Sequence, residues 1–140
     1  MKPSEVRKRI LEEHAALRRL LAEVEGLAER YEDGSADLAP MLLERGRTLY
    51  ESLAAHLDVE DAYLAPALRA AGAEGERRAE SLAHEHREQR ELLRYLLGRI
   101  HELQRPTILI AREVRSFVGY VRVDMEHEEK TILSEAVFRD

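Results

Sequence analysis

Cysteine and tryptophan are absent from the 140 residues of this chain, and glycine (7) and proline (4) are scarce. The absence of cysteine excludes a disulfide framework, a thiolate nucleophile and thiolate-type zinc or iron–sulfur sites. Because residues that favour turns are few and Ala, Leu, Glu and Arg are abundant, the composition predicts a mostly helical protein. The length fits a single domain.

Long hydrophobic runs are also missing. No apolar segment approaches the roughly 20 residues of a membrane span, and the segment after Met1 lacks the apolar run of a secretory signal. The formal net charge of −6 disfavours binding to a phosphate backbone. We therefore expect a cytoplasmic protein that binds neither membranes nor nucleic acids, and the sequence does not identify a protein partner.

Helix-breaking residues divide the chain into four helical segments. The first is expected to end near Gly34 and the second before Gly72, and Pro106 is expected to open the fourth. Asp37 should cap the second helix, and Pro66 should kink its last turn. The predicted helices span residues 4–32, 37–71, 74–104 and 106–137. Because the loops are short, we predict an all-α, up-down-up-down antiparallel four-helix bundle, formed by one domain over residues 1–140.

The inward-facing positions of these helices are apolar except in one layer. At 1.5 Å per residue, the polar positions of all four helices lie at one level, roughly 15–20 Å from the same end of the bundle. The polar inward-facing residues are His14, His56, Glu60, His86, Gln89, Asp124 and Glu128, with Thr131 beyond them. Four helices therefore bring imidazole and carboxylate groups to one place.

Metal ions solve the electrostatic problem that this layer creates. Three imidazoles and three carboxylates have no inward-facing Lys or Arg to neutralise them, and burying an unpaired charge costs several kcal/mol. Two divalent cations would leave a site charge of about +1, which an oxide or hydroxide can offset. Nitrogen and oxygen ligands without sulfur favour iron or manganese, with zinc as an alternative.

Two pairs of candidate ligands have the spacing of one helical turn. His56 precedes Glu60 by four residues, and Asp124 precedes Glu128 by four. Residues four apart lie on the same helix face, so the glutamate of each pair can reach across to bridge two metals.

This pattern resembles the hemerythrin-like, or HHE cation-binding, family of four-helix bundles, and the resemblance covers nearly the whole chain. The matching segments are Glu12-Glu13-His14, His56 to Asp61, Leu64 to Leu68, Glu85-His86-Arg87 and Glu128-Glu129. Family members are non-haem di-iron proteins. The resemblance implies two iron atoms per chain, with the ligands His14, His56, Glu60, His86 and Glu128 and with both glutamates bridging.

The chain departs from the family pattern at two positions. Asp124 stands where the family usually has a histidine, and Arg90 stands where oxygen-carrying hemerythrins have a second histidine on the third helix. Anionic ligands stabilise the ferric state. We therefore expect reactions with oxygen, peroxide or nitric oxide, with oxidation or peroxide decomposition favoured over reversible oxygen carriage.

The sequence predicts roles for several further residues near the layer, some with an alternative. His127 could replace Asp124 as a ligand, or it could face solvent. Gln89 is expected to donate a hydrogen bond to a ligand carboxylate. Tyr63 and Tyr120 could pack as amphipathic core residues or donate a hydrogen bond at the metal. The remaining histidines, expected at the surface, are His84 and His101.

Two other functions fit the same layer. One is an iron- or oxygen-responsive sensor without turnover, in which metal occupancy changes contacts with a partner. The other is a structural bundle whose polar layer holds no metal. Metal content and catalytic consumption of oxidant distinguish these functions, and the sequence does not decide whether the chain is an enzyme.

Overall fold

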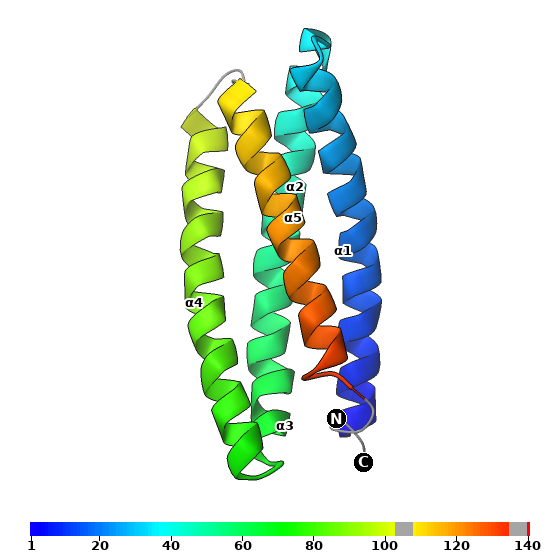
Figure 1. The fold of residues 1–140 in the computed structure, drawn as a ribbon, viewed down its shortest axis with the longest axis vertical. Coiled ribbons are helices and arrows are strands. Elements are labelled where there is room, and N and C mark those ends of the chain that lie inside the picture. The colour runs from blue at the N-terminus through cyan, green and yellow to red at the C-terminus, as the bar shows by residue number, and fades with distance from the viewer. Residues whose placement is uncertain (103–107, 135–139) are drawn as a thin grey trace.

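The computed structural model describes residues 1–102, 108–134 and 140, and the side chains of residues 100–102 are outside this description. Four long helical columns run antiparallel, with both termini at the same end (Figure 1). The described elements are α1 (Pro3–Glu32), a 3₁₀ turn η1 (Ala36–Leu38), α2 (Ala39–Val59), a π-helical turn η2 (Glu60–Leu64), α3 (Ala65–Arg69), α4 (Ala73–Glu102) and α5 (Ile108–Lys130). The predicted all-α, up-down-up-down bundle is confirmed.

Glycine ends the first two columns. Gly34 and Gly72 have φ angles of 109° and 105°, in the left-handed region that favours glycine. The prediction that Asp37 caps the second helix is wrong. Asp37 lies in the 3₁₀ turn, and α2 begins at Ala39 without a side-chain cap because its N-cap residue, Leu38, has no side-chain oxygen.

The backbone irregularity linked to Pro66 lies in the turn before this proline, whereas the sequence predicts a kink in the last turn of the helix. Pro66 has no N–H, and its ring crowds the carbonyl group four residues before it. The backbone widens into the π-helical turn just before Pro66, where the N–H of Ala65 donates to the carbonyl oxygen of Glu60, five residues back. The predicted kink therefore takes the form of a π turn that begins at Glu60. Such single π turns are frequent at functional sites.

The last two predicted helices differ from the structure at their ends. Residues 103–107 and 135–139, which include parts of both predictions, lie outside the described residues. The predicted end of the fourth helix at residue 137 is wrong, because α5 ends at Lys130 and a turn follows. In that turn the N–H of Leu133 donates to the carbonyl oxygen of Glu128, and the Leu133 side chain is fully buried. Burial of this side chain accompanies the change of direction.

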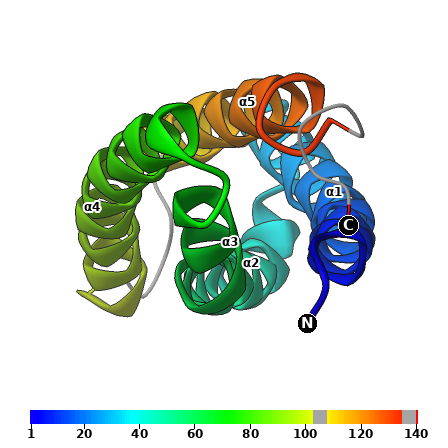
Figure 2. The same cartoon turned by 90° about the horizontal axis from the view of Figure 1, so that it is seen from below.

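Two apolar clusters fill the bundle. The smaller cluster lies near the termini and includes Ile10, Leu68 and Leu82. The larger cluster fills the rest of the bundle and includes Leu53 and Phe117. Helix α1 packs between α2 and α5, and α4 packs against α2 and α3, so the columns enclose the core when seen from below (Figure 2). None of the helices described is long and apolar enough to span a membrane.

Candidate metal centre

Five polar side chains are buried between the two apolar clusters. Their exposed fractions run from 0% for His14 to 6% for His56. They come from every column of the bundle: α1, the α2–η2 column, α4 and α5. The five residues are His14, His56, Glu60, His86 and Glu128. The structure thus brings five of the six predicted ligands into one buried layer.

Four of these side chains converge tightly. The Nε2 atoms of His14 and His56 lie 3.2 Å apart, and His56 Nε2 lies 3.0 Å from Glu60 Oε1. Glu128 Oε1 lies 3.3 Å from His14 Nε2. One nitrogen or oxygen atom from each of the four lies within 4.8 Å of all the others. This spacing suits a single metal ion held by two imidazoles and two carboxylates.

His86 lies at the side of this group. Its Nε2 atom is 3.6 Å from Glu60 Oε1, the same oxygen that contacts His56. Glu60 therefore stands between two imidazoles from different helices, in a position from which one carboxylate can serve two cations.

An outer carboxylate faces the Nδ1 atom of each histidine. His56 Nδ1 lies 2.7 Å from Glu13, and His86 Nδ1 lies 2.6 Å from Asp61. His14 Nδ1 is 3.5 Å from Glu129. A hydrogen on Nδ1 leaves Nε2 free to bind a metal, and such carboxylate partners fix the orientation of metal-binding histidines.

Inward-facing periodicity does not predict a role for these outer carboxylates. A signal was present, because each one directly adjoins a candidate ligand: Glu13 precedes His14, Asp61 follows Glu60 and Glu129 follows Glu128. Each faces a histidine on a different helix, with a hydrogen bond for Glu13 and Asp61, and that pairing appears only once the helices are packed.

Arginines neutralise the outer carboxylates. Arg18 makes a bidentate contact with Glu129 at 2.8 and 2.5 Å. Arg90 donates to Asp61 at 2.6 Å, and also to Asp58 at 3.0 Å. Arg9 pairs with Glu13 at 3.3 Å. The outer negative charges are therefore already balanced by protein groups.

The inner carboxylates have no such partner. In the described part of the chain, no lysine or arginine pairs with Glu60 or Glu128, and Glu60 Oε2 and Glu128 Oε1 accept no hydrogen bond. His14 Nε2 is close to Glu128 but not in hydrogen-bonding geometry. Buried, unsatisfied carboxylate oxygens beside imidazole nitrogens fit a bound metal cation, which would satisfy both.

The pKa values of the histidines follow their carboxylate partners. Burial, aided by the nearby His56, lowers the pKa of His14. Burial opposes protonation of His56 too, but Glu60 and Glu13 outweigh it and raise the pKa of His56. In the same way Glu60 and Asp61 overcome burial and raise the pKa of His86.

The two inner carboxylates shift in opposite directions. Burial and the negative charge of Glu60 raise the pKa of Glu128 well above its usual range. Burial acts on Glu60 as well, but hydrogen bonds from His56 and His86 outweigh it and lower the pKa of Glu60. Without a metal, the layer therefore favours one ionised and one protonated glutamate.

Asp124, the sixth predicted ligand, lies outside the tight group. Met125 takes the buried position between Val121 and Glu128, and Asp124 is only half-buried. Its carboxylate accepts a hydrogen bond of 2.8 Å from Gln89, so the expected donation of Gln89 to a ligand carboxylate stays a prediction that depends on Asp124 being a ligand. Burying Met125 removes more apolar surface from water than burying Asp124 would, so Asp124 lies half-buried at the pocket beside the layer, and its role as a ligand stays a prediction.

The other candidates lie at the surface. His127 is exposed, and His84 is exposed as predicted, paired with Glu88. Tyr63 is 40% exposed and lies under the guanidinium of Arg9, and Tyr120 is 43% exposed. Neither phenol belongs to the buried group, and the His101 side chain lies outside the described residues.

The structure is an antiparallel four-helix bundle with a buried layer of histidines and carboxylates that could hold a metal ion. Comparison with protein families matches residues 6–136 to the hemerythrin HHE cation-binding domain. The match covers nearly the whole chain, and the chain belongs to this family. No curated protein and no solved structure gives a significant match.

Proposed function

We propose that the chain is a non-haem iron protein that holds two iron atoms per molecule and reacts with oxygen, hydrogen peroxide or nitric oxide. The observation that carries the proposal is the group His14, His56, Glu60 and Glu128, whose ligand atoms lie within 4.8 Å of one another in a buried layer without a neutralising cation among the described residues. Imidazole and carboxylate ligands without sulfur suit iron, with manganese and zinc less favoured.

The residues divide between two metal positions in this proposal. His14 and His56 hold the first ion, and His86 holds the second. Glu60 and Glu128 are shared, which the contacts of Glu60 with both His56 and His86 support. Asp124, whose Oδ2 atom accepts from Gln89, is the sixth proposed ligand, with His127 as the alternative. Tyr63 and Tyr120 stay proposals as hydrogen-bond donors.

The protein groups around the site favour oxidation chemistry over oxygen carriage. Bound ferrous iron would supply electrons to a small oxidant. Arg90 is occupied by Asp61 and Asp58 and cannot act as a ligand. The centre therefore has fewer neutral ligands than a carrier site, and more of its ligand charge comes from carboxylates. The buried imidazoles hold their Nε2 atoms toward the inner carboxylates, and apolar clusters lie on both sides of the layer.

The test is the reversibility of oxygen uptake. Reduced, iron-loaded protein is mixed with oxygen, the oxygen pressure is then lowered, and the visible spectrum is followed. We expect the protein to stay oxidised, and we expect Asp124→His to shift it toward reversible uptake. Recovery of the colourless ferrous form by removing oxygen alone would contradict the proposal and indicate a carrier.

A second measurement separates an enzyme from a sensor. We expect the reduced protein to consume peroxide or oxygen over repeated turnovers, with peroxide decomposition or ferrous oxidation as the reaction. A single oxidation without turnover would instead favour the iron- or oxygen-responsive sensor. The cytoplasmic location stays a prediction.

A further inference from the structure

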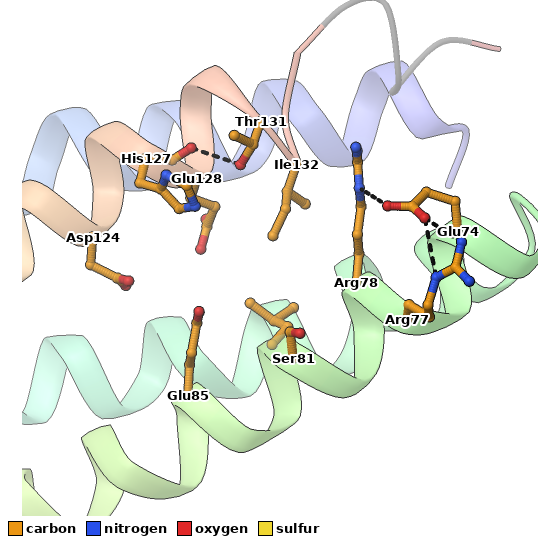
Figure 3. A pocket seen from close by; sticks show the side chains of 11 residues that line it. Glu74, Arg77, Arg78, Ser81, Glu85, Asp124, His127, Glu128, Thr131 and Ile132 are labelled. Atoms are coloured by element: carbon orange, nitrogen blue, oxygen red, sulfur yellow. Dashed lines mark hydrogen bonds and ion pairs between the residues drawn. The ribbon is translucent and has the colours of Figure 1, made fainter.

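A pocket of about 400 Å³ lies between α4 and α5 and reaches the buried layer. Four carboxylate side chains line this space: Glu74 at its outer end and Glu85 from α4, and Asp124 and Glu128 from α5 (Figure 3). Glu85 and Asp124 are half-buried, whereas Glu128 belongs to the inner group. The pocket therefore joins the surface of the protein to a proposed metal ligand.

The inner end of the pocket carries a carboxyl oxygen without a hydrogen-bond partner among the described residues. Glu128 is 5% exposed, and its Oε1 atom accepts no hydrogen bond from any described residue. Its side chain extends from α5 toward the space in front of Glu85 (Figure 3). A buried carboxylate oxygen that lacks a donor and faces a solvent-connected pocket is a position for a cation.

The cations that line the pocket do not neutralise this end. Arg77 and Arg78 lie at the outer end, where both pair with Glu74, at 2.6 and 3.4 Å (Figure 3). Asp124 is hydrogen-bonded to the neutral amide of Gln89. Carboxyl groups without an arginine or lysine partner among the described residues therefore line the path between the surface and Glu128.

Two other pockets differ from this one in their lining. A pocket of about 280 Å³ between α1 and α2 reaches His56, but its carboxylate, Glu13, is already held by His56 and Arg9. A larger pocket of about 600 Å³ on α4 and α5 is lined mainly by apolar side chains and includes none of the buried ligands. A charged, hydrated cation is attracted to carboxylates, so the acidic pocket suits it best.

We propose that the pocket between α4 and α5 is the entry site for divalent metal ions, and that Glu85 binds the incoming hydrated cation before it reaches Glu128. The inference rests on the metal centre proposed above. Glu85 lies outside the tight ligand group. Its removal therefore changes how fast the metal arrives, and leaves the amount bound at equilibrium unchanged.

The experiment measures the rate at which the metal-free full chain takes up Co²⁺, followed by its visible absorption after rapid mixing. Glu85→Gln should lower the second-order rate constant about three- to tenfold, with the same final Co²⁺ content, because a charge in a cleft raises the rate of cation encounter. Raising the salt concentration should slow the wild type more than Glu85→Gln. Glu85→Asp should restore most of the rate.

Glu88→Gln is the matched control, because Glu88 is on the same helix, is exposed and pairs with His84 away from the pocket. Its loading rate should stay within about twofold of the wild type, since exposed charges are screened by solvent. An unchanged rate in Glu85→Gln, or an equal loss in Glu88→Gln, would overturn the entry role. A lower final Co²⁺ content in Glu85→Gln would make Glu85 a ligand and also overturn it. If no protein took up Co²⁺, the metal centre itself would be contradicted.

Discussion

Each buried histidine is held on two sides by groups with different tasks. The Nε2 atom faces the inner carboxylates, and the Nδ1 atom faces an outer carboxylate on another helix. The outer carboxylates carry arginine partners, so their charge is balanced without a metal. The inner carboxylates lack such partners among the described residues, and a metal cation is the group that would complete them.

Asp61 provides a residue-scale test, because it orients His86 without belonging to the inner group. Asp61→Asn should lower metal affinity about 10- to 100-fold, since metal sites lose that much when the partner of a ligating histidine is changed. Asp58→Asn is the control: Asp58 also accepts from Arg90 but has no histidine contact among the described residues. Titration with a divalent metal measures both. Equal losses would show that Arg90, and not the orientation of His86, matters.

The pH dependence of stability follows from the histidine pKa values. In the metal-free protein the pKa values of His56 and His86 are raised above 6.5. A side chain whose pKa is higher in the folded than in the unfolded state stabilises the fold fully at a pH below its unfolded pKa. That contribution to the free energy of unfolding is lost as the pH rises through the folded pKa. The raised pKa of Glu128 acts in the same direction. Metal-free protein should therefore lose stability as the pH rises above about 6.5.

Metal binding has the opposite dependence, because it requires neutral imidazoles. The melting temperature of metal-loaded protein should exceed that of metal-free protein by a margin that widens from about pH 6 to pH 8. Thermal melts of both forms across this range test the prediction. A constant margin would mean that His56 and His86 do not release protons when the metal binds.

At the scale of elements, the turn between α3 and α4 depends on one close approach. A Cβ atom on Gly75 would overlap the carbonyl oxygen of Leu68, which belongs to the backbone of α3 and cannot move aside easily. Gly75→Ala should destabilise the fold by about 1–3 kcal/mol through overpacking. Gly26→Ala should be neutral or stabilise by up to about 1 kcal/mol, because a Cβ there has open space in the middle of α1. Chemical denaturation measures the free energy of unfolding of both variants. Equal values for Gly75→Ala and Gly26→Ala would contradict the close approach of Gly75 to Leu68.

The π-helical turn is the element that the sequence pattern could not supply. Hydrophobic periodicity distinguishes α-helix from strand, but an i+5 hydrogen bond leaves no signature beyond the nearby Pro66. The position of Asp124 was equally hard to predict, because both Asp124 and Met125 complete an alternation of three and four residues between Val121 and Glu128. Only packing against the other helices selects Met125 for burial.

At the scale of the whole molecule, the polar layer divides the core into two apolar clusters. Counting residues from the helix breaks predicts this level for His14, His56, Glu60, His86 and Glu128, because antiparallel columns of similar length share their ends. The contacts between helices were beyond prediction, since the pairing of each histidine with an outer carboxylate depends on rotation of the columns about their axes.

The most direct test of the account is the iron retained after metal-free protein is loaded with ferrous iron without oxygen and then desalted. The wild type should retain about two iron atoms per chain, as di-iron bundles do. His56→Ala should retain much less, because its Nε2 is central to the inner group. His84→Ala should match the wild type, because His84 is exposed and pairs with Glu88. If the wild type retained no more iron than His56→Ala, the buried layer would not be an iron centre.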